Sequence, residues 1–164
     1  MQVLDENPPR GMTQHLQRLL DQTLLTIDEA SFPRGIAYDC IELRFLMNRP
    51  GAETIVLEED GGVIAAFLLM EINRRRKNAT LVTLDVRDEK RRQGYASDLL
   101  RYSEQILREY GVLVYDLQVD TQNDGALSFY RKHGFQVEKR LEKYYSGGHD
   151  AWQMIKKLPP SSGA

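Results

Sequence analysis

Residues 80–100 read TLVTLDVRDEKRRQGYASDLL: an apolar run, a basic loop with one glycine, and a second apolar segment. The first run predicts a strand, and apolar residues at helical spacing over 99–110 predict a helix that follows the loop. A helix N-terminus carries unpaired N–H groups and about half a positive charge, so it attracts anions. Gly94 lacks the Cβ that would keep a phosphate from the backbone. Ala96 has the smallest side chain after glycine, so it permits a second close approach. The stretch is typical of a phosphate-binding loop, although a plain strand-to-helix turn fits it equally well.

Three basic residues beside this glycine, Lys90, Arg91 and Arg92, add positive charge to the same loop. Other phosphate-binding patterns are missing: the sequence has no G-x-x-x-x-G-K-[ST] motif, and no G-x-G-x-x-G follows a strand. A nucleotide hydrolase or a dinucleotide oxidoreductase is therefore poorly supported.

The composition is that of one globular domain over residues 1–164, with 41% apolar and 28% charged residues. The end of the chain, PPSSGA at 159–164, is typical of a flexible tail. Cys40 is the only cysteine, which excludes an intramolecular disulfide and fits a reducing compartment. The polar start has no apolar segment like that of a secretory signal. We therefore expect a cytoplasmic protein.

The charge balance predicts neither nucleic acid nor a membrane as a partner. Twenty-two Lys and Arg residues stand against 24 Asp and Glu, a net charge of −2. This near balance gives no electrostatic reason to bind nucleic acid or an anionic membrane. His15, His133 and His149 are scattered without metal-ligand spacing, so we predict no metal site. The densest charge run, NRRRKN at 73–78, is interpreted as a solvated hairpin tip.

The elements expected around the opening stretch alternate between helical and strand patterns. Their order predicts an α/β fold, with an α+β mixed sheet and helices on both of its faces. Helices are predicted at 13–27, 38–47, 99–110 and 123–132, and strands at 54–58, 63–72, 79–86, 112–119, 136–143 and 151–158, with a further short edge strand at 2–4.

Two parts of the sequence resemble a known family. The loop at 91–96, RRQGYA, resembles the [RQ]-x-x-G-x-[GA] loop of the GNAT acyl-CoA N-acetyltransferases, which lies between their fourth strand and third helix. Residues 117–158 are similar to protein N-terminal acetyltransferases of the RimI type. The shared pattern is Asn123, Ala126, Phe129-Tyr130, Gly134-Phe135, Tyr144-Tyr145, Asp150-Ala151 and Met154, and both parts together comprise 48 of the 164 residues.

The resemblance implies a GNAT-like sheet, largely antiparallel and splayed between its fourth and fifth strands. It also implies direct transfer of an acetyl group from acetyl-CoA to a primary amine, with a protein or peptide N-terminal α-amine as the first candidate. A small-molecule amine or an amino acid is the alternative acceptor. A non-catalytic acyl-CoA-binding regulatory module is an alternative of another class.

The resemblance further implies which residues hold the cosubstrate. The pyrophosphate of coenzyme A would lie on the backbone of the 91–96 loop, and the pantetheine arm would pair with the edge of the preceding strand. Asn123 would contact the arm, although it also fits a plain helix cap. The implied cofactor-binding residues are Leu84, Asp85, Val86, Arg91, Arg92, Gln93, Gly94, Tyr95, Ala96 and Asn123.

Tyr130 is the implied catalytic residue, because it matches the tyrosine whose hydroxyl points at the cofactor sulfur in such enzymes. A phenol can protonate the leaving thiolate or donate a hydrogen bond to it. The alternative is a core aromatic that packs beside Phe129 and Ala126.

The general base is the point at which the sequence departs from the resemblance. Where relatives place a glutamate or histidine, this chain has Gln118, and an amide can hold a water or the amine but cannot accept a proton. Asp120 on the same strand face and Asp85 on the facing strand are candidates for the base, as are water and backbone carbonyls. Both carboxylates also fit plain strand-end positions.

The acceptor groove is implied by three aromatic residues. Tyr144 and Tyr145 match the paired tyrosines that help to grip the first residues of the peptide in N-terminal acetyltransferases. Phe32, followed by Pro33, falls where that group builds the opposite wall. Tyrosines near a strand end are also ordinary sheet residues.

Overall fold

The computed structural model of the protein describes residues 2–3 and 40–160. The helix predicted at 13–27 and the predicted groove residue Phe32 lie outside the described residues, as does most of the predicted tail. Within the described part of the chain, no helix is long and apolar enough to cross a membrane.

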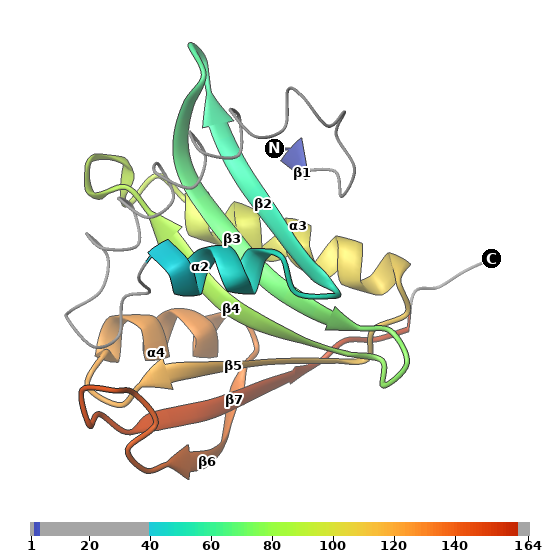
Figure 1. Ribbon diagram of the computed structural model, residues 1–164, viewed down its shortest axis with the longest axis vertical. Coiled ribbons are helices and arrows are strands. Elements are labelled where there is room, and N and C mark those ends of the chain that lie inside the picture. The colour runs from blue at the N-terminus through green and yellow to red at the C-terminus, as the bar shows by residue number, and fades with distance from the viewer. Residues whose placement is uncertain (1, 4–39, 161–164) are drawn as a thin grey trace.

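The described chain forms a single seven-stranded sheet with helices on both faces, which confirms the predicted fold class (Figure 1). The strands are β1 (Gln2–Val3), β2 (Ala52–Glu59), β3 (Val63–Asn73), β4 (Asn78–Val86), β5 (Val114–Asp120), β6 (Gln136–Leu141) and β7 (Ala151–Lys157). The helices are α2 (Cys40–Met47), α3 (Tyr95–Glu109) and α4 (Asp124–Lys132), with a 3-10 turn at Asp88–Lys90.

The strand order is β1-β2-β3-β4-β5-β7-β6, and the sheet is mixed as predicted. Every neighbouring pair is antiparallel except β4 and β5, which are parallel. The strand predicted at 136–143 ends earlier, at Leu141. Lys143 has a φ of 48°, and the extended conformation of a strand cannot include such a residue.

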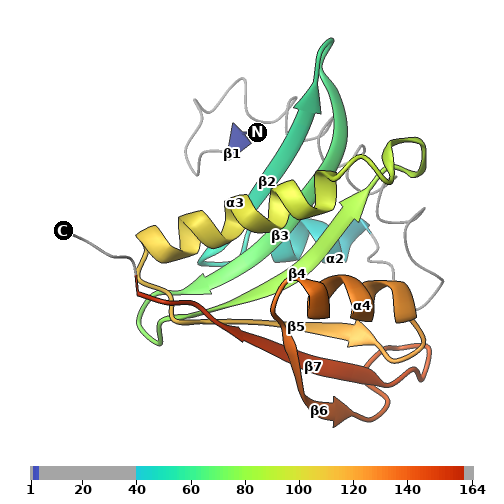
Figure 2. The ribbon, with the colours of Figure 1, turned by 180° about the vertical axis from the view of Figure 1, so that it is seen from behind.

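The long central strand β3 is buried on both faces, which explains its continuous apolar sequence. Ala66, Leu68 and Met70 belong to a large core with α3 and α4, whereas Phe67 and Leu69 pack with α2. This division follows from the alternation of side chains along a strand. Figure 2, seen from behind, shows α3 and α4 on the face of the sheet opposite to α2.

The sheet opens between β4 and β5, which confirms the predicted splay. The two strands pair only from Asn78↔Val114 to Leu81↔Leu117, although both continue beyond these residues. The β3–β4 register shifts at this level, so that Val82 is an extra residue on β4. Such a bulge bends its strand, and this one immediately follows the last β4–β5 pair. The carboxyl ends of β4 and β5 therefore diverge (Figure 2).

The turn from α2 into β2 depends on Gly51. Its φ is 83°, and an added Cβ would lie 2.2 Å from the Ile72 carbonyl oxygen, part of a neighbouring strand that cannot move aside. We expect Gly51→Ala to lower the free energy of unfolding by about 3 kcal/mol, measured by denaturant titration. Gly61→Ala is the matched control, because its φ is 89° but its Cβ would meet nothing within 4 Å. Equal losses in the two variants would refute the steric part of this argument.

Candidate active site

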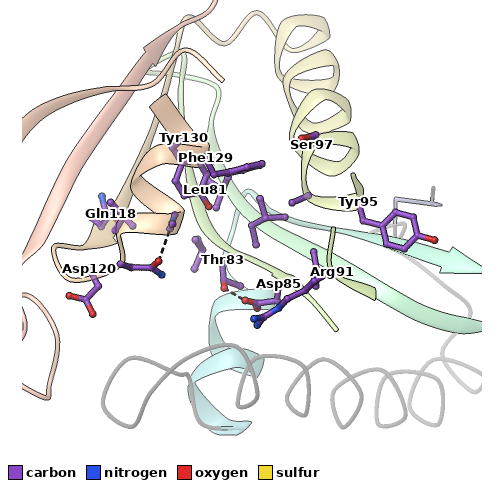
Figure 3. A pocket seen from close by; sticks show the side chains of 18 of the residues that line it. Leu81, Thr83, Asp85, Arg91, Tyr95, Ser97, Gln118, Asp120, Phe129 and Tyr130 are labelled. Atoms are coloured by element: carbon purple, nitrogen blue, oxygen red, sulfur yellow. Dashed lines mark hydrogen bonds between the residues drawn. The ribbon is translucent and has the colours of Figure 1, made fainter. Parts of the chain in front are cut away.

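A cavity of about 610 Å³ lies where β4 and β5 separate. Figure 3 shows Gln118 and Asp120 along one side of it and Arg91 and Tyr95 along the other. The lining comprises residues 81–86 of β4, residues 90–92 and 94–97 before and within the first turn of α3, residues 118–120 of β5, Asn123, Gly125, Ala126, Phe129, Tyr130 and Tyr145.

The cavity brings together most residues that the sequence singled out. All predicted cofactor-binding residues line it except Gln93, whose side chain is exposed. Of the predicted acceptor residues, Gln118 and Tyr145 line it, and Tyr144 lies next to it with its hydroxyl 3.3 Å from Gln118 Oε1. The positions of these residues are thus known, whereas their roles stay predictions.

The loop between β4 and α3 places the first amides of the helix, which have no helical carbonyl partner, at the cavity wall. Arg92 and Gly94 both have a left-handed backbone, with φ of 64° and 81°, and Gly94 is the N-cap of α3. The Asp98 N–H donates to Gly94 O at 3.0 Å, whereas earlier amides of a helix have no carbonyl one turn before them. A Cβ on Gly94 would meet nothing within 4 Å, so it would project into open space at the cavity wall. The loop therefore fits a phosphate group.

The positive charge beside this loop is partly neutralised, which the sequence did not reveal. Lys90 Nζ lies 2.7 Å from Glu59 Oε2, and Arg91 pairs with Asp88 at 2.9 Å. Lys90, followed by the Tyr95 hydroxyl, holds the pKa of the Glu59 carboxyl below its usual range. These contacts fasten the start of α3 to β2. In the described part of the chain, Arg92 has no ion-pair partner, so backbone amides carry most of the attraction for an anion.

Asn123 caps α4 at the carboxyl end of β5. Its side-chain oxygen accepts a hydrogen bond from the Ala126 N–H at 3.0 Å, so the plain reading as a cap is correct. The residue also lines the cavity, which keeps a cofactor contact compatible with the cap.

Tyr130 lines the cavity and is the one buried residue of α4, with 9% of its surface exposed. Phe129 and Phe135 pack edge-on against its ring, with centroids at 5.2 and 5.6 Å. Burial, with a smaller contribution from Asp85, raises the pKa of the Tyr130 phenol above its usual value. No residue within 2–3 or 40–160 hydrogen-bonds its hydroxyl. The phenol therefore stays protonated near neutral pH and keeps a hydrogen bond to offer.

The side chain of Gln118, which stands at the position of the expected base, is hydrogen-bonded only to neutral side chains within the described residues. Gln118 Nε2 donates to Gln153 Oε1 at 2.7 Å on β7, and the Tyr144 hydroxyl donates to Gln118 Oε1 at 3.3 Å. These bonds fix the amide at the cavity wall, where it can orient a ligand but cannot take a proton.

The two candidate carboxylates have different surroundings. Asp85 is 1% exposed and accepts a hydrogen bond from Thr83 Oγ1 at 3.0 Å. Asp120 is 9% exposed and lies 2.9 Å from Nδ1 of His149, a residue that sequence reasoning had set aside. The only signal for this contact is the pairing of β5 with β7, which places Asp120 opposite Ala151. One sequence without its topology does not contain that signal.

The chain matches known proteins over most of its length. The sequence profile of the acetyltransferase (GNAT) family matches residues 18–135. N-alpha-acetyltransferase 30 of Schizosaccharomyces pombe is 29% identical over 112 residues, which is 68% of this chain and 75% of that protein. The N-alpha-acetyltransferase of Sulfurisphaera tokodaii is 30% identical over 117 residues, 65% of this chain and 70% of that protein.

Solved structures share the fold. The ribosomal-protein-S18-alanine N-acetyltransferase of Escherichia coli superposes with a TM-score of 0.72 at 24% identity, over 87% of this chain and 90% of that chain. Ard1 of Thermoplasma volcanium superposes with a TM-score of 0.71 at 22% identity, over 85% and 93%. Because the family profile covers well over half of the sequence, the chain belongs to the GNAT acetyltransferase family and is an acyl-CoA N-acyltransferase.

Proposed function

We propose that this enzyme transfers the acetyl group of acetyl-CoA to the N-terminal α-amine of a protein or peptide. The observation that carries the proposal is one cavity that joins the α3 loop, the free edge of β4, Tyr130 and Tyr145. The two N-alpha-acetyltransferases described above support the choice of acceptor. The cytoplasmic location expected from the sequence stays a prediction.

Acetyl-CoA would bind from the α3 loop toward the centre of the sheet, and it would supply an activated thioester. The amides at the start of α3 would hold its pyrophosphate, with Arg92 as the nearest unpaired cation in the described chain. Beyond Leu81, β4 has no paired strand on its β5 side within the described residues. Its free edge suits the amide groups of an extended ligand, which could add to it as a strand would.

Tyr130 would stabilise the departing thiolate. A thiol has an ordinary pKa of about 8.5, whereas burial raises the phenol above its own ordinary value of about 10. Complete proton transfer from Tyr130 to the thiolate is therefore uphill. The phenol instead contributes as a hydrogen-bond donor to the charge that develops on sulfur.

The acceptor would enter from the side of β7. The rings of Tyr144 and Tyr145 pack perpendicular to each other with centroids 5.0 Å apart, and Tyr145 lines the cavity. Tyr144 is 49% exposed, yet its hydroxyl bonds Gln118 at the cavity wall. This pair offers two aromatic faces and two hydroxyls to the first residues of a peptide.

Two assays test the proposal. Saturating acetyl-CoA should raise the melting temperature, because ligand at 100 times its Kd adds about 2.7 kcal/mol to stability. Thiol release should then be followed with peptides that have free N-termini, the same peptides with blocked N-termini, polyamines and free amino acids. We expect turnover only with free N-termini. Equal rates on blocked peptides that contain lysine, or faster turnover of polyamines, would contradict the proposed acceptor.

A further inference from the structure

Asp120 and His149 form a titratable pair at the cavity. Asp120, the last residue of β5, lines the cavity, and its Oδ2 lies 2.9 Å from Nδ1 of His149 in the loop before β7. Asp120 is almost fully buried, whereas the His149 side chain is one-third exposed. The buried carboxylate at the cavity wall is thus hydrogen-bonded to an imidazole ring that solvent can reach.

Both residues are held in place by backbone contacts. The other oxygen of Asp120, Oδ1, accepts a hydrogen bond from the Gln122 N–H at 3.1 Å. The His149 carbonyl accepts from the Tyr145 N–H at 3.1 Å, and the Asp150 carbonyl accepts from the Thr121 N–H at 3.0 Å. The loop before β7 is therefore fastened to itself and to the residue that follows β5.

The hydrogen bond fixes the chemistry of the ring. An ionised carboxylate can only accept, so the imidazole that faces it carries its hydrogen on Nδ1. Nε2 then keeps its lone pair, and a carboxylate behind the ring stabilises the imidazolium that forms when Nε2 takes a proton. A buried carboxylate that orients an accessible imidazole is a typical arrangement for a general base.

We propose that His149, positioned by Asp120, accepts the proton that the acceptor ammonium must lose before it attacks acetyl-CoA. This inference rests on the proposed function. The ammonium N–H bond breaks, a first water takes that proton and passes one of its own to a second water, and the second water in turn passes a proton to His149 Nε2. The neutral amine then forms the new C–N bond as the C–S bond breaks. The attacking nitrogen loses its second proton to the thiolate or to water, and His149 returns its proton to solvent.

The need for bridging waters follows from the distance along β5 between Gln118 and Asp120, the residue that holds His149. Gln118, at the position where relatives place their base, precedes Asp120 by two residues on the same strand face. Two residues span about 7 Å along a strand, which is longer than the two hydrogen bonds of a single bridging water and matches a chain of two waters. Gln118 can hold one of these waters with its amide.

Other groups near the pair are less suited to the task. Both oxygens of Asp120 are engaged in hydrogen bonds, and histidine is the side chain that most often serves as a general base. Asp150, next in the chain to His149, is occupied by Arg140 at 2.6 Å and by the Lys143 N–H at 2.8 Å. The charged or titratable groups that face the loop around His149 are Asp120 of β5, Arg140 of β6 and Lys143, Tyr145 and Asp150 of the loop itself.

The test compares pH profiles of kcat/KM for His149→Gln and for the parent with a free N-terminal peptide. An α-amine has an ordinary pKa of about 8, so a base is needed at about pH 7 but not at about pH 9.5. We expect His149→Gln to lower kcat/KM about 100-fold at the lower pH and only a few-fold at the higher pH, with the Kd for acetyl-CoA unchanged. A loss by the same factor at every pH would show a purely structural role and overturn the inference.

Asp120→Asn provides a second readout if His149→Gln folds poorly. The carboxamide oxygen still accepts from Gln122, but its N–H₂ group would donate to Nδ1 and move the ring hydrogen to Nε2. We expect the same pH-dependent loss, as the wrong tautomer has no lone pair on Nε2. His133→Gln is the matched control, because His133 caps the other end of α4, and we expect parental kinetics from it.

The outcomes separate the inference from the proposed function. If the parent acetylates free N-termini and both variants keep parental rates at about pH 7, the inference is wrong and the proposed function stands. If the parent acetylates no free N-terminus, both are wrong.

Discussion

Replacing Tyr130 with phenylalanine should lower kcat about 100-fold and leave the Kd for acetyl-CoA nearly unchanged. The ring would keep its contacts with Phe129 and Phe135, so the variant should fold. In the proposed mechanism it would lose a hydrogen bond from a desolvated donor to the sulfur, whose charge is largest in the transition state. A group that binds the transition state better than the ground state acts on kcat, and for this reason cofactor affinity should not change.

The pH dependence of the parent enzyme provides a further check on the role of Tyr130. Because burial raises the pKa of Tyr130, the phenol remains a donor at any pH below its ordinary range, and the parental kcat should show no alkaline fall up to about pH 10. Tyr102→Phe is the matched control, because Tyr102 is a partly buried tyrosine packed on the same core. A Tyr130→Phe rate equal to that of Tyr102→Phe would refute the assigned role.

Gly94→Ala should raise the Kd for acetyl-CoA about 30-fold, measured by calorimetry. The new Cβ would occupy open space at the cavity wall, where we propose that the amides of the α3 loop bind the phosphates, and the proposed charge-assisted hydrogen bonds would lengthen or break. The variant should also lose about 1 kcal/mol of stability, because alanine strains the left-handed backbone at φ of 81°.

Gly111→Ala separates strain from steric obstruction of the site. Gly111 follows the other end of α3, its φ is 72°, and its Cβ would also meet nothing within 4 Å. It should cost similar stability and leave acetyl-CoA affinity at the parental value. If both variants weakened binding equally, the loop at Gly94 would not be the pyrophosphate site.

The parts of this protein that sequence predicts well are those with a local cause. The apolar run of β3, the Asn123 cap and the glycine before α3 each depend on residues within one or two turns, so pattern and propensity identify them. The 74–77 turn is likewise local, and its exposed charges agree with the interpretation as a solvated hairpin tip.

The features that sequence did not predict depend on pairings between distant residues. Lys90 is paired with Glu59, 31 positions earlier in the chain, so part of the charge expected at the phosphate loop is cancelled. His149 meets Asp120 across 29 positions only because β7 adds antiparallel to β5. No periodicity in a single sequence specifies such a contact. The proposed proton acceptor is therefore apparent only from the topology, even though Gln118 shows in the sequence that a base is missing from its usual place.

The most direct test of the central claim is to locate the acetyl group on a product. A peptide with a free α-amine and one internal lysine would be incubated with the enzyme and acetyl-CoA, and the product sequenced by tandem mass spectrometry. The account predicts acetylation at the α-amine, with the lysine unmodified and no product from the same peptide with a blocked N-terminus. Acetylation at the lysine, or no acetylated peptide under conditions in which acetyl-CoA binds, would contradict it.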